Sequence, residues 1–156
     1  MITEPNLQKA FSLLKDKGSV LGLTHSLLEE RNRLQLEMES IAQSFKTTFT
    51  PPWTVYLSAQ SKARGSVYLR WRNSGRATKQ SYFDLFDSER GNEILKKQSS
   101  QVLALFVSFE EKRLELNLAH SLATHAWVRL RQHEHNCLSV TKYKDVLTNN
   151  NKRSTN

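Results

Sequence analysis

An uninterrupted apolar repeat in the C-terminal half of the chain sets the strongest limit on its fold. Apolar residues recur at every seventh position, at Leu95, Val102, Phe109, Leu116, Ala123 and Leu130. Neither Pro nor Gly follows Gly91, so no residue there is a strong helix breaker. A helix of about 45 residues from about Asp87 would be roughly 65 Å long. Because an apolar stripe of that length must be covered, the pattern predicts one very long C-terminal helix with other helices packed along it.

Two N-terminal helices are expected to pack antiparallel along the long helix. The first is predicted from about Glu4 to Asp16, because Thr3 suits an N-cap and Gly18 suits a C-terminal stop. The second is predicted from roughly Thr24 to Lys46. Its apolar stripe consists of Val20, Leu27, Leu34, Met38, Ile41 and Phe45.

The apolar period changes to two after Pro51 and Pro52, which is typical of strands. Alternating runs begin at Trp53 and Val67, and a third extends from about Thr78 to Phe83. With a turn at residues 73–75, these runs predict a three-stranded antiparallel meander. The expected fold class is therefore α+β and mostly helical, with a single domain over residues 1–148. The polar segment 149–156 is expected to be disordered.

The predicted sheet carries most of the excess charge of the chain. Its 23 Lys and Arg against 15 Asp and Glu give a net charge of +8, and the segment Pro51–Phe83 contributes +6 of this without a single acid. Basic groups neutralise phosphates, and aromatic rings stack on bases. The segment therefore predicts a nucleic-acid surface, with cations contacting phosphates and tyrosines stacking or inserting. The candidate residues are Lys62, Arg64, Tyr68, Arg70, Arg72, Arg76, Lys79 and Tyr82.

An alternative interpretation is that these cations pair with acidic residues of the helices or of a partner protein. The acids available for this are Glu29, Glu30, Glu37, Glu39, Glu110, Glu111 and Glu115. A second basic and aromatic group, formed by Trp127, Arg129 and Arg131, is interpreted as a solvated helix flank.

No catalytic arrangement is recognisable, so the expected protein is not an enzyme and needs no cofactor. The sequence has no phosphate-binding glycine loop, nucleophile elbow or paired cysteine motif. His133, Glu134, His135 and Cys137 could in principle bind a transition metal. Because there is no second cysteine and no known ligand spacing, this group is interpreted as a solvated helix end and no metal is expected.

The remaining expectations concern location and partners. The single Cys137, the lack of a signal sequence and the lack of an 18-residue apolar run favour a cytoplasmic protein without a membrane span. The apolar series of the long helix exceeds what two N-terminal helices can cover, which indicates a homodimer or a protein partner. The alternative function is therefore a protein-interaction or assembly subunit that docks through the long helix.

Two segments, Val67–Arg72 and Arg113–Ala126, resemble a family of unknown function. Its members are encoded on bacterial integrating conjugative elements, and some are labelled integrase regulators. The resemblance spans roughly Leu57 to Gln132 through short motifs. It implies a mobile-element context and a DNA-related role, so DNA is expected ahead of RNA. The basic hairpin is also similar in pattern to the three-stranded arm-binding domains of some tyrosine integrases, although here the sheet sits between helices. The resulting hypothesis is a non-catalytic nucleic-acid-binding accessory or regulatory protein of a mobile genetic element.

Overall fold

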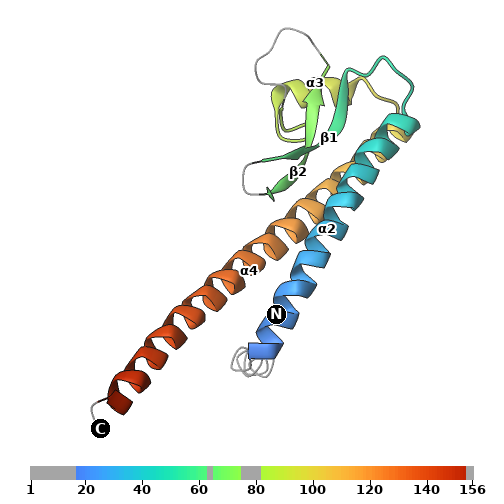
Figure 1. Ribbon diagram of the computed structural model, residues 1–156. Coiled ribbons are helices and arrows are strands. Elements are labelled where there is room, and N and C mark those ends of the chain that lie inside the picture. Colours follow the sequence, from blue (N-terminus) through green and yellow to red (C-terminus); the bar gives the residue numbers. More distant parts are fainter. Residues whose placement is uncertain (1–16, 63–64, 75–81, 154–156) are drawn as a thin grey trace, which may run out of the picture. The chain divides into compact units, whose positions relative to one another are not determined.

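The computed structural model describes residues 17–62, 65–74 and 82–153 and is mostly helical (Figure 1). The elements in chain order are α2 (Lys17–Thr48), β1 (Val55–Ser61), β2 (Val67–Asn73), α3 (Glu89–Lys96) and α4 (Ser100–Arg153). The predicted α+β class is confirmed. The described residues group into two compact units, one within residues 31–122 and the other formed by residues 17–30 with 123–153.

The long C-terminal helix is confirmed, but its start and end differ from the prediction. Helix α4 has 54 residues and is continuous through the region of His120. Helix α3 ends just before α4 begins. Its last turn is closed by hydrogen bonds from the Lys97 N–H to the Ile94 carbonyl and from the Gln98 N–H to the Leu95 carbonyl. The Ser99 hydroxyl then accepts a bond from the N–H of Val102, near the start of α4. At its other end, α4 includes residues 149–153 of the segment predicted to be disordered.

The prediction of two N-terminal helices does not match the structure. The described part contains one, α2, which begins at Lys17 and runs through both Gly18 and Gly22. The expected first helix, Glu4–Asp16, lies outside the described residues. Glycine within a helix costs only about 1 kcal/mol relative to alanine, so Gly18 does not force a stop. Val20, two residues further on, is buried.

Among the described residues the sheet has two strands, which does not match the predicted three-stranded meander. Strands β1 and β2 pair antiparallel, in the register Val55 with Asn73 and Ser61 with Val67. In place of a third strand, Tyr82 forms an isolated bridge with Arg72, and the N–H of Phe83 lies 3.4 Å from the carbonyl of Trp71. Residues 78–81 of the predicted third run lie outside the described residues.

The hairpin loop is held by its backbone and by helix α2. The N–H of Lys62 donates to the carbonyl of Ser66 at 2.7 Å, and Gly65 has a φ of 75° that favours glycine. From α2, the guanidinium of Arg31 donates to the Gly65 carbonyl at 3.0 Å. These bonds hold the end of the hairpin that carries Lys62.

One face of the hairpin forms the core of the 31–122 unit. Leu57, Leu69 and Trp71 are each at most 1% exposed, as expected for alternate residues on one face of a strand. The Trp71 ring lies 5.5 Å from Phe45 of α2 and 5.6 Å from Phe106 of α4. The sheet is therefore packed on both helices, and the predicted burial of its apolar face is confirmed.

The other unit is a pair of helix segments. Val20 and Thr24 of α2 and Ala123 of α4 are buried. The Thr24 hydroxyl lies 2.9 Å from the carbonyl of Val20 and 2.7 Å from the Glu134 carboxylate of α4. Among the described residues, no helix has the length and apolar character needed to cross a membrane.

Candidate functional site

The face of the hairpin opposite the core carries the predicted basic and aromatic residues. Tyr56 comes from β1, and Tyr68, Arg70 and Arg72 come from β2. Because neighbouring residues in a strand point to opposite sides, the burial of Leu57, Leu69 and Trp71 places these side chains on the outer face. They are half-buried, since each lies against its neighbours rather than extending freely into solvent.

Cations and tyrosine rings alternate along this face in one continuous series, here called the cation–tyrosine stack. Arg70 lies 5.2 Å from the ring centre of Tyr68 and 5.3 Å from that of Tyr82. Arg72 lies 5.1 Å from the ring centre of Tyr82 and 6.0 Å from that of Tyr56. The series ends in lysines, with Lys62 at 5.1 Å from Tyr68 and Lys46 at 5.9 Å from Tyr56. Its members in order are Lys62, Tyr68, Arg70, Tyr82, Arg72, Tyr56 and Lys46.

The stack orders its positive charges. A cation over an aromatic face gains about 0.5–1 kcal/mol at an exposed site, and a guanidinium stacked on a ring keeps its donors in the plane free for other ligands. Tyr82 contacts both arginines and so links the two. The result is a row of positioned cations on a fixed sheet surface.

The structure brings together five of the eight predicted site residues and adds two. Arg64, Arg76 and Lys79 lie outside the described residues, and their roles stay predictions. Lys46 and Tyr56 were not among the candidates. Tyr56 stands in the same basic segment and could have been included, whereas Lys46 lies on α2, and only the folded chain brings it beside Tyr56.

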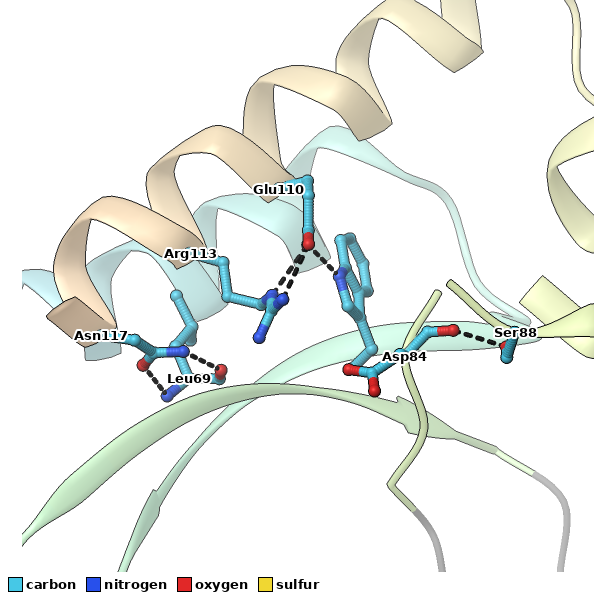
Figure 2. A network of polar contacts seen from close by, with 7 residues as sticks. Leu69, Asp84, Ser88, Glu110, Arg113 and Asn117 are labelled. Carbon is cyan, nitrogen blue, oxygen red and sulfur yellow. Dashed lines mark hydrogen bonds and ion pairs between the residues drawn. The ribbon is translucent and has the colours of Figure 1, made fainter. Parts of the chain in front are cut away.

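Beneath the stack, a partly buried ionic network ties β2 to α4 (Figure 2). The indole N–H of Trp71 donates to Glu110 at 2.7 Å, and Arg113 donates to both oxygens of the same carboxylate at 2.7 Å. Burial by itself raises the pKa of Glu110, but the hydrogen bonds from Arg113 and Trp71 and the charge of Arg113 outweigh it, so this pKa is lowered. The hydrogen bond to Glu110 likewise raises the pKa of Arg113. Both groups therefore stay charged and locked together at neutral pH.

Asn117 of α4 fixes the outer edge of β2. Its side-chain carbonyl accepts from the Leu69 N–H at 2.8 Å, and its amide donates to the Leu69 carbonyl at 2.9 Å (Figure 2). The side chain thus takes the place of a neighbouring strand at this position. Sequence reasoning missed this role. The one signal was a poor helix former in the middle of a helix, which is a weak indication of a tertiary contact.

The helix acids that could have neutralised the stack are mostly engaged on their own helices. Glu37 pairs with Arg33 and Glu115 with Lys112. Glu39 accepts from Gln35, Glu29 lies near His25, and Glu110 holds Arg113 and Trp71. Within residues 17–62, 65–74 and 82–153, neither Arg70 nor Lys62 forms an ion pair. These contacts disfavour the alternative that Arg70 and Lys62 are balanced internally.

The second basic group and the histidine cluster each lie within helix α4. Arg131 lies 5.3 Å from the ring centre of Trp127 on α4. The sulfur of Cys137 lies 3.5 Å from Nε2 of His133, one helical turn away. In the part of the chain that the structure describes, no three His, Cys, Asp or Glu side chains are grouped as metal ligands.

Together the fold and the site define a mostly helical α+β protein that presents an ordered basic and aromatic sheet face. We found no matching family model for this chain. No curated protein and no solved structure matches it either. The inference of function therefore rests on the chemistry of the site.

Proposed function

We propose that this protein is a non-catalytic nucleic-acid-binding protein and that the cation–tyrosine stack contacts the phosphate backbone. The observation that carries the proposal is the alternation of Lys62, Arg70, Arg72 and Lys46 with three tyrosine rings on one outer sheet face. Successive positions on one face of a strand are about 6.8 Å apart. That spacing suits contacts with successive phosphates of an extended strand.

The arrangement favours a polyanion over a single small anion. Several positioned cations in a row recover free energy by releasing counterions from a charged polymer, and each adds to the salt dependence of binding. A small anion would need the cations to converge on one point. Here the tyrosine rings between them keep them apart.

An accessory or regulatory role in a mobile genetic element remains part of the proposal. It rests on the resemblance of the segments Val67–Arg72 and Arg113–Ala126 to proteins of integrating conjugative elements. That resemblance also makes DNA the first ligand to test, with RNA second.

A salt titration of binding to labelled oligonucleotides tests the proposal. Four phosphate contacts give a slope of log affinity against log salt of about −2.8 to −3.6, so affinity should fall roughly 50- to 150-fold between 50 and 200 mM salt. The Arg70→Glu/Arg72→Glu variant should lose most of this binding and at least half of the slope. A matched control, Arg129→Glu/Arg131→Glu, makes the same charge change at exposed positions on α4.

The outcomes separate clearly once circular dichroism has shown that both variants are folded. Loss of binding in the sheet variant alone supports the stack as the interface. Equal loss in both variants would mean that net charge rather than the stack governs binding. Absence of binding to any DNA or RNA would refute the proposed function.

A second candidate function is a protein-assembly role for α4. Its Leu114, Leu118 and Leu122 are 53%, 62% and 62% exposed and recur at four-residue spacing on one side of the helix. Light scattering after size exclusion tests this role. The role is supported if the native protein forms a stable dimer or larger assembly and Leu118→Lys dissociates it. A monomer at all accessible concentrations would count against it.

A further inference from the structure

A surface cavity of about 380 Å³ opens beside the cation–tyrosine stack. Tyr68, Arg70 and Tyr82 belong to both the stack and the cavity wall. Small-ligand sites range upward from about 300 Å³, so this cavity is of a size for one nucleoside-sized group.

Unlike the stack, the cavity has a carboxylate in its wall as well as cations. Asp84, Arg113 and Asn117 line it together with the shared residues (Figure 2). Arg113 is held in place by Glu110, and Asn117 by the backbone of Leu69. Asp84 is exposed, and among the described residues its carboxylate takes part in no hydrogen bond or ion pair. The cavity thus combines a carboxylate acceptor with fixed guanidinium and amide groups.

This combination suits a base better than a phosphate. A carboxylate in the wall repels a phosphate, whereas the edge of a nucleobase presents both donors and acceptors. The aromatic rings of Tyr68 and Tyr82 in the wall suit the flat surface of a base. A base can use these groups only when its own pairing edge is free.

We propose that this cavity takes one unpaired base while the neighbouring stack holds the phosphates, so the preferred ligand is single-stranded nucleic acid. The inference rests on the proposed function and specifies its ligand class. The Asp84 carboxylate accepts hydrogen bonds from the donors on the edge of the base. Arg70, shared by stack and cavity, lies at the junction of the phosphate and base contacts.

A pair of charge-matched variants tests the inference. Asp84→Ala and Asp87→Ala remove the same charge from exposed positions of one connecting segment, and Asp87 does not line the cavity. If Asp84 acted only as a repelling charge, both variants would bind nucleic acid more tightly. If Asp84 contacts a base, Asp84→Ala should bind single strands about fivefold or more weakly, because a base-edge contact contributes about 1–3 kcal/mol.

Binding should be measured at one salt concentration with an oligonucleotide alone and with the same oligonucleotide fully paired. We expect the native protein to prefer the single strand, and Asp84→Ala to lose that preference while Asp87→Ala keeps it. Asp84→Asn, which retains the shape but exchanges an acceptor for a donor, should weaken single-strand binding in the same way. This variant guards against a local change of fold in Asp84→Ala.

The inference is overturned if the native protein binds single and double strands equally, or if both aspartate variants bind single strands more tightly. In either case, binding that still depends on Arg70 and Arg72 leaves the proposed function intact. Lack of binding by the native protein to both ligands would refute the proposed function itself.

Discussion

Asn117 of α4 makes two hydrogen bonds to the backbone of Leu69 in β2, at 2.8 and 2.9 Å. A helix side chain thus provides hydrogen bonds to a strand that, in the described part of the chain, pairs with one other strand. The adjacent residues Tyr68 and Arg70 form the outer face of the site. The position of the cation–tyrosine stack therefore depends on a contact made at the outer edge of β2.

We predict that Asn117→Ala destabilises the protein by about 2 kcal/mol or more, because both backbone groups of the fully buried Leu69 lose their partner. Urea denaturation measures the change. Ser121→Ala is the matched control, since it alters an exposed residue one helical turn further along α4. Its effect should stay within about 0.5 kcal/mol. Equal effects of the two substitutions would show that the Asn117 bonds contribute little.

Two glycines should respond to alanine with opposite signs. Gly65→Ala should destabilise by about 1–2 kcal/mol, because Gly65 has a φ of 75° and the new Cβ would meet the Arg31 guanidinium at 3.2 Å. Gly22→Ala should stabilise by about 1 kcal/mol, because Gly22 lies in helix α2 with nothing within 4 Å of the new Cβ. Thermal or urea unfolding of both variants checks the signs. A stabilising Gly65→Ala would contradict the loop geometry.

Stability should fall as the pH drops below about 6.5 because of His120. This histidine is 2% exposed, and burial, with the charge of Arg31 adding to it, lowers its pKa. The unfolded chain then binds the proton at a higher pH than the folded chain does. The contribution of neutral His120 is therefore complete above the unfolded pKa and is lost as the pH falls through and below it.

Urea midpoints at pH 7.5 and 5.5 test this prediction, because the lowered pKa of Glu110 keeps its titration below that interval. The native protein should have the lower midpoint at pH 5.5, and His120→Leu should show a smaller difference between the two values. The absolute stability of the variant is not the readout, since the substitution also changes packing. An unchanged difference in the variant would place the pH dependence in other groups.

Tyr82 should matter to binding although it carries no charge. Tyr82→Leu removes the ring that lies 5.3 Å from Arg70 and 5.1 Å from Arg72, while every cation stays in the chain. If the cation–π contacts that position the two arginines contribute about 1 kcal/mol to the free energy of binding, their loss weakens the affinity for the oligonucleotides roughly fivefold. Tyr82→Phe keeps the ring and should bind nearly as the native protein does. If the leucine variant binds as tightly as the phenylalanine variant, stacking does not order the arginines.

Sequence periodicity was a good guide to the elements whose apolar residues repeat regularly. The seven-residue series predicted the long helix, and the alternation around Trp71 predicted the buried and outer faces of β2. Periodicity did not predict where the helices begin and end. The series from Leu95 onward continues in step across the interruption at residues 97–99, so no pattern signalled that α3 and α4 are separate.

The third strand illustrates a different limit. The run ending at Phe83 has strand-like alternation. Of its described residues, Tyr82 forms an isolated bridge with Arg72, and the N–H of Phe83 bonds to the carbonyl of Trp71. Further along β2, Asn117 occupies the edge at Leu69. Whether an edge is paired by a strand or by a side chain depends on a residue 48 positions away in the chain, which local propensity does not register.

By itself, the sequence determined which residues face the core, that helices dominate, and that positive charge and tyrosines share one strand face. These follow from period and composition, which are local properties of the chain. Only the tertiary structure decided that Lys46 joins the stack, that Glu110 and Asn117 support β2, and that Asp84 meets Arg113 at one cavity. The physical reason is that each of these contacts joins elements distant in the chain, and their geometry exists only once the hairpin is packed on the two helices.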